Sequence, residues 1–135
     1  MAWEQLKDFH PIWIGVSASN IEYYLGPGFT YLNAFLFKLS NGDPIILAWF
    51  SSFLGLVTTG SIYYTVRDLF GKKPAFIAMT IYGASAFLIF FDRRFWNPTP
   101  IPIITTWLIY SLIKGHKNSR WYLLTIALYA AFYHV

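Results

Sequence analysis

The sequence has 135 residues, of which 56% are hydrophobic and only 12% are charged, and it contains no cysteine. Because charged residues make up about a quarter of a typical soluble domain, this composition disfavours a soluble globular protein. The absence of cysteine excludes disulfide scaffolds and thiolate metal sites. The net charge is +4, but no basic stripe is interleaved with exposed aromatic residues, so we do not expect nucleic-acid binding.

Residues 1–43 are predicted to form an extracytoplasmic loop that carries interfacial helices. Residues 1–20 are amphipathic and contain tryptophans, which prefer the membrane interface. Residues 29–39 are apolar, but they are fewer than the roughly twenty that a spanning helix needs. Asp43 and Pro44 favour the start of a helix, since Asp caps helices and Pro is tolerated at the first helical position.

Four apolar segments follow, and they predict an all-α, polytopic transmembrane region over residues 44–135. The predicted spans cover residues 44–66, 74–91, 100–113 and 121–135. The last is shorter than a full span, so we expect it to be incomplete. Small residues at 83–86 predict a face for helix packing in the second span.

The connections between the spans predict an orientation. Those after the first and third spans hold six of the ten lysines and arginines and a single acid, Asp68. The six are Arg67, Lys72, Lys73, Lys114, Lys117 and Arg120. The positive-inside rule places these connections in the cytoplasm and the N-terminal loop on the outer face. We therefore expect a multi-pass integral protein of the cell (inner or plasma) membrane.

A charged and proline-rich stretch separates the second and third spans. It begins Asp92-Arg93-Arg94-Phe95-Trp96-Asn97 and continues with three prolines, which interrupt the hydrogen bonds of a helix. Ionisable groups beside a span lie at an interface or a water-filled cavity, where they pair or bind a ligand. A guanidinium group binds phosphate through two parallel hydrogen bonds. We predict a substrate-binding site at Arg93 and Arg94, oriented by Asp92, Trp96 and Asn97. The alternative is that the arginines extend toward lipid headgroups.

Acids of the N-terminal loop are candidates for a catalytic base. Glu22 and Asp8 each provide a carboxylate of the kind that general-base catalysis needs, and their sequence setting does not choose between them. The three histidines, His10, His116 and His134, are too far apart to indicate a metal site. We expect neither a metal nor a cofactor.

Four sequence blocks resemble glycosyltransferase family 39. They are YLGPGFTYLNAFLF from Tyr24, GDPI from Gly42, RDLFG from Arg67 and RRFWNP from Arg93, and they span roughly residues 20 to 100. The family comprises membrane-embedded GT-C enzymes related to dolichyl-phosphate-mannose protein mannosyltransferases and to bacterial lipid A aminoarabinose transferases. The resemblance implies an inverting transferase that takes a sugar from a polyprenyl-phosphate donor on the outer face.

The resemblance also implies that an acid of the first extracytoplasmic loop acts as base. In the family this acid usually follows a first transmembrane helix, and Glu4 and Asp8 do not reproduce the motif. We therefore expect a fragment of the enzyme that is inactive alone, with the lipid-linked donor and membrane lipids as partners. Two alternatives are a small non-catalytic membrane protein that binds lipid or assembles with a partner, and a transporter fragment.

Overall fold

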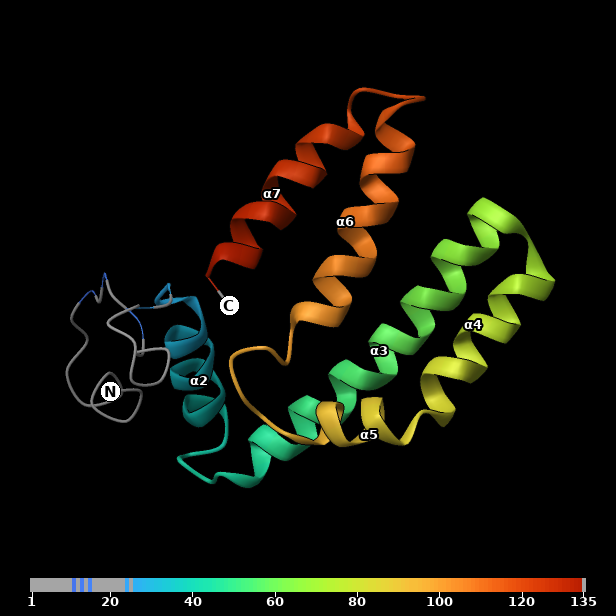
Figure 1. Ribbon diagram of the computed structural model, residues 1–135. Coiled ribbons are helices and arrows are strands. Elements are labelled where there is room, and N and C mark those ends of the chain that lie inside the picture. Colours follow the sequence, from blue (N-terminus) through green and yellow to red (C-terminus); the bar gives the residue numbers. More distant parts are fainter. Residues whose placement is uncertain (1–10, 12, 14, 16–23, 25, 135) are drawn as a thin grey trace.

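The computed structural model describes residues 11, 13, 15, 24 and 26–134. Within them the helical elements are α2 (Gly28–Leu39), α3 (Ile45–Phe70), α4 (Lys72–Ala84), α5 (Ala86–Arg93), α6 (Ile101–Gly115) and α7 (Trp121–Tyr133) (Figure 1). Every regular element of this part of the chain is an α-helix, which confirms the predicted all-α class. The helix predicted at 29–39 is present as α2, and its position at the membrane interface stays a prediction.

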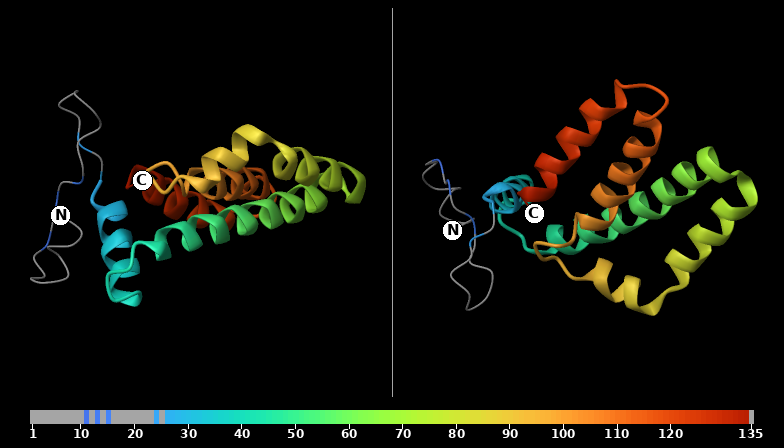
Figure 2. Two further views of the ribbon diagram at one scale, coloured as in Figure 1. Left: turned by 90° about the horizontal axis from the view of Figure 1, so that it is seen from below. Right: turned by 45° about the horizontal axis from the view of Figure 1, so that its top comes forward.

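The central element is α3, which packs against α2, α4, α5 and α6. The long helices form two hairpins, α3 with α4 and α6 with α7, which join side by side through α3 and α6 (Figures 1 and 2). The short helix α2 lies beside the first residues of α3, at the end of the molecule where α7 also ends (Figure 1). The connection from α5 to α6 lies at this same end of α3.

The burial pattern of α3 is the reverse of that in a soluble protein. Its buried residues are small and polar, namely Ser51, Thr58, Ser61 and Thr65. Large apolar residues such as Trp49 and Leu56 are instead 70% and 73% exposed. Small residues let helix backbones approach closely within a bilayer, where lipid tails surround the outward apolar side chains. The outer surface of α3 therefore suits a hydrocarbon environment.

Helix length limits which elements can cross a bilayer. Of the described helices, α3 alone is long and apolar enough by itself; its 26 residues extend about 39 Å. The pair α4 and α5 passes the same test jointly, but it is bent by 64°. The helices α6 and α7 have only 15 and 13 residues. Four separate spans are thus not confirmed, and the crossing by α6 and α7 stays a prediction.

The predicted second span over residues 74–91 is built from two helices, α4 and α5, and not from one. The helix breaks at Ser85, whose extended backbone ends α4 and whose Oγ accepts a hydrogen bond from the N–H of Leu88 at 3.5 Å. Serine favours such caps because its hydroxyl can bond nearby backbone groups. A Cβ added at Gly83 would meet no atom of the described residues within 4 Å, so the packing face at 83–86 stays a prediction.

The ends of α3 also differ slightly from the prediction. The helix begins at Ile45, one residue after the predicted start, and the Asp43 carboxylate still accepts the Ile45 N–H at 2.9 Å. At the other end, α3 runs through the predicted connection to Phe70. It stops at Gly71, whose φ of 95° suits glycine.

An ion pair joins the two hairpins at the end of the molecule that carries the predicted basic connections. The Asp68 carboxylate of α3 lies 2.5 Å from Lys114 Nζ of α6 and accepts a hydrogen bond from the Tyr110 hydroxyl at 3.0 Å. We call this the basic end; its cations are Arg67, Lys72, Lys73, Lys114, Lys117 and Arg120. The two connections therefore lie on one side of the helices, as the charge pattern predicted.

A contact between α2 and the end of α7 closes the opposite end of the molecule. The N–H of Phe29 donates to the His134 carbonyl at 3.3 Å. A Cβ added at Gly26 would lie 2.6 Å from His134 Nδ1, and one added at Gly28 would lie 2.8 Å from His134 Cβ. The two glycines are needed here because no side chain fits between the two segments.

Candidate functional site

The turn between α5 and α6 contains the predicted site and is organised by Thr99. We call residues 92–100 the charged turn. The Thr99 hydroxyl donates to the Arg94 carbonyl at 2.8 Å and accepts the Trp96 N–H at 2.9 Å. Thr99 is buried, with 4% of its surface exposed. Its two bonds therefore fix the backbone on both sides of Phe95.

Two contacts fasten the charged turn to the rest of the molecule. The Ser51 hydroxyl of α3 donates to the Asp92 carbonyl, and it also lies 3.5 Å from the Arg94 carbonyl. The Phe95 ring stacks on Phe29 of α2, with centroids 5.1 Å apart, and meets Phe50 of α3 edge-on at 6.1 Å. Helix α3 thus holds the backbone of the turn, and α2 and α3 together hold its Phe95 ring.

An apolar groove with a volume of about 350 Å³ lies beside the charged turn. Its walls are Phe87, Phe90 and Phe91 of α5 together with Trp96, and Arg94 is the charged residue among its lining residues. The Trp96 ring packs edge-on against Phe91 at 5.4 Å. The arrangement places a solvent-exposed guanidinium group beside aromatic side chains. It can accommodate a molecule with one anionic group and one apolar chain.

Asp92 is half-buried where α5 packs on α3 and α4. Both of its carboxylate oxygens are 3.3 Å from the Tyr82 hydroxyl of α4. The same side chain packs on α3, where a Cβ added at Gly55 would lie 2.9 Å from Asp92 Oδ2. Asp92 makes no ion pair with an arginine in the described part of the chain. It therefore links α3, α4 and α5 and does not orient the arginines by direct pairing.

The other predicted site residues take different positions. Arg93 is exposed on the last turn of α5 but does not line the groove, and Asn97 is half-buried in the charged turn. The structure thus brings Arg94 and Trp96 together at one groove. Glu22 and Asp8, the candidate bases, lie outside the described residues. In the described part, no group of three His, Asp or Glu side chains could hold a metal ion.

Sequence reasoning missed the residues that support the charged turn. Ser51, Gly55 and Tyr82 come from two other helices and are separated from the turn by long apolar runs. Thr99 carried a usable signal, because a hydroxyl residue beside prolines often bonds to the backbone of its own turn. The contacts of the other three depend on helix packing and leave no local pattern.

These features define a helical protein built for a lipid bilayer, with a polar turn held against an apolar groove. The family model for dolichyl-phosphate-mannose-protein mannosyltransferase matches residues 25–133. The chain belongs to this family of integral membrane glycosyltransferases of the GT-C type, which confirms the resemblance seen in the sequence and extends it to α7. No curated protein and no solved structure matches the chain.

Proposed function

We propose that the chain is part of a membrane glycosyltransferase that uses a polyprenyl-phosphate-linked sugar and delivers the sugar to an acceptor on the extracytoplasmic face. The observation that carries this proposal is the groove at the charged turn. It combines one arginine, Arg94, with the aromatic surface of α5. A polyprenyl phosphate has the matching combination of an anionic phosphate and a long apolar chain.

The phosphate of the donor binds Arg94, and its apolar chain follows Phe87 and Phe90 toward the bilayer. A charge-assisted hydrogen bond contributes about 1.5–3 kcal/mol, and the planar guanidinium can form two of them to one phosphate. Arg93 adds positive charge next to this position, and Asn97 remains available to the sugar. Glu22 and Asp8 stay the candidate bases for the acceptor hydroxyl.

Replacing Arg94 with lysine tests the site. We expect Arg94→Lys to weaken binding of dolichyl-phosphate mannose to the full chain in lipid nanodiscs by about tenfold, since lysine keeps the charge but loses the planar fork. Arg93→Lys should change the Kd by no more than about threefold, because Arg93 does not line the groove. Titration with the radiolabelled lipid gives each Kd.

The matched control is Arg120→Lys at the basic end, which should bind the lipid as the unchanged chain does. A Kd for Arg94→Lys equal to that of Arg120→Lys, with helicity retained in both, would show that the arginine merely extends toward headgroups. Measuring the two variants with mannose-free dolichyl phosphate separates recognition of the phosphate from recognition of the sugar.

A multi-pass topology is part of the proposal, with the charged turn outside and the basic end in the cytoplasm. The natural absence of cysteine allows single-cysteine labelling with an impermeant thiol reagent in intact cells. Asn20→Cys and Arg94→Cys should be labelled, whereas Lys72→Cys and Lys117→Cys should react only after permeabilisation. Labelling of Lys72→Cys but not Asn20→Cys in intact cells would reverse the orientation.

A further inference from the structure

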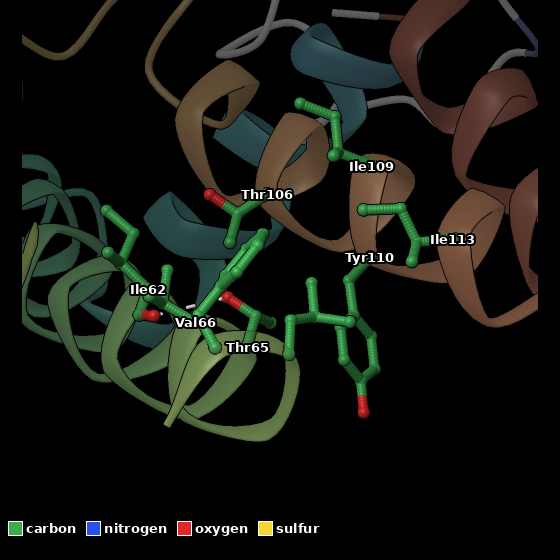
Figure 3. A pocket seen from close by; sticks show the side chains of 9 residues that line it. Ile62, Thr65, Val66, Thr106, Ile109, Tyr110 and Ile113 are labelled. Atoms are coloured by element: carbon green, nitrogen blue, oxygen red, sulfur yellow. Dashed lines mark hydrogen bonds between the residues drawn. The ribbon is translucent and has the colours of Figure 1, made fainter. Parts of the chain in front are cut away.

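A second groove lies between α3 and α6, toward the basic end and away from the charged turn. Its volume is about 320 Å³, at the lower end of the range for small-molecule sites. Figure 3 shows the side chains of Ile62 and Val66 on one wall and those of Ile109 and Ile113 on the other. None of its lining residues is charged.

The hydroxyl groups of this groove already have partners within the protein. Thr65 donates to the Ser61 carbonyl at 2.8 Å, and Thr106 donates to the Pro102 carbonyl at 2.8 Å. The Tyr110 hydroxyl donates to Asp68 at 3.0 Å. Because these donors are satisfied, an occupant gains little by offering hydrogen-bond acceptors to the walls. The groove therefore suits a hydrocarbon chain.

Basic residues follow two of the groove's lining residues directly or closely in the sequence. The lining residue Ile113 is followed directly by Lys114, and the lining residue Phe70 is followed by Gly71 and then Lys72 and Lys73. The only acid here, Asp68, is bound to Lys114 and Tyr110. The remaining cations of the basic end form no ion pair with the described residues. They are therefore available to an anionic group.

We propose that this groove binds an anionic phospholipid from the leaflet at the basic end. One acyl chain lies between α3 and α6, and the headgroup phosphate lies among the lysines of the two connections. Each basic residue near an anionic membrane surface adds a favourable contribution, which a neutral or zwitterionic headgroup lacks. A second copy of the chain, packed alongside in the same orientation, would bring two basic ends together, and their like charges disfavour that occupant.

Blocking the groove tests where the acyl chain of the lipid lies. The full chain is equilibrated in micelles with equal amounts of phosphatidylglycerol and phosphatidylcholine that carry the same acyl chains, and retained lipid is counted by native mass spectrometry. We expect preferential retention of phosphatidylglycerol. Ile109→Trp fills the groove and should lower this retention at least about fivefold. Ile81→Trp, at a 65% exposed position on α4, should not change it.

Removing charge tests where the headgroup lies. Lys72→Gln and Lys73→Gln should each reduce the preference for phosphatidylglycerol by about fivefold, and Lys38→Gln on α2 should have no effect. Equal retention of the two lipids by the unchanged chain would refute the proposal. Equal phosphatidylglycerol retention by Ile109→Trp and Ile81→Trp would also refute it. A dimer peak that Ile109→Trp abolishes would refute it as well, because it would identify a second copy of the chain as the occupant.

Discussion

Gly55→Ala is expected to destabilise the protein, whereas Gly60→Ala on the same helix is expected to stabilise it. A Cβ at position 55 would lie 2.9 Å from Asp92 Oδ2 and 3.2 Å from Asp92 Cβ. The carboxylate can rotate, but the Asp92 backbone is held by Ser51, so α5 must move. Overpacking of this kind costs about 1–3 kcal/mol.

At position 60 an added Cβ meets no atom within 4 Å. Alanine is favoured over glycine inside a helix by about 0.8–1 kcal/mol, so this variant gains stability. Denaturant titration followed by circular dichroism in detergent gives the free energy of unfolding of both variants. Gly55→Ala should also weaken dolichyl-phosphate mannose binding by about tenfold, because α5 carries the groove. Equal stability of the two variants would mean that α5 does not rest on Gly55.

Thr99→Val should disrupt the charged turn while preserving the shape of the side chain. The substitution removes a partner of both the Arg94 carbonyl and the Trp96 N–H. The Arg94 carbonyl keeps the Ser51 hydroxyl at 3.5 Å, so the Trp96 N–H is the group left without a partner. Such a loss costs about 1–3 kcal/mol, which is the decrease that we expect in the free energy of unfolding. Donor binding should fall by about tenfold or more, because the backbone that directs Arg94 is no longer fixed.

Thr80→Val provides the matched control for this experiment. Thr80 is exposed, and its hydroxyl donates only to the Phe76 carbonyl of its own helix, at 2.8 Å. Its replacement should change stability by less than about 0.5 kcal/mol and leave donor binding intact. If Thr99→Val behaves like Thr80→Val in both measurements, the hydroxyl network does not organise the site.

The apolar runs of the sequence were sufficient to predict where most helices lie. Their flanking Asp, Pro and Gly residues gave helix ends within a few positions, as at Asp43 and Pro44. The break at Ser85 was not predictable from hydrophobicity, because residues 74–91 are uncharged and mostly apolar on both sides of it. What determines the break is the local cap by Ser85 together with the packing of α5 on α3, and only the packing is a tertiary feature.

The candidate site was predictable in its charged residues but not in its construction. Arg93 and Arg94 are conspicuous because charge beside a long apolar run has few explanations. The distinction between them, with only Arg94 lining the groove, depends on where α5 ends and on the Thr99 bonds. Helix packing brings Asp92 to Tyr82 and Gly55, which the sequence does not show, so its predicted part in orienting the arginines stays a prediction.

The contact of α2 with His134 has a consequence for the order in which the protein matures. Phe95 stacks on Phe29 of α2, and the N–H of that same Phe29 is bound by the carbonyl of His134. A ribosome makes α2 and the charged turn well before it makes the end of α7. Nascent chains halted before α7 would therefore lack the His134 bond to Phe29 and keep only the packing of α2 on α3 and Phe95. The full set of contacts at Phe29, which supports Phe95 of the charged turn, is completed only when the last described residues have emerged and docked.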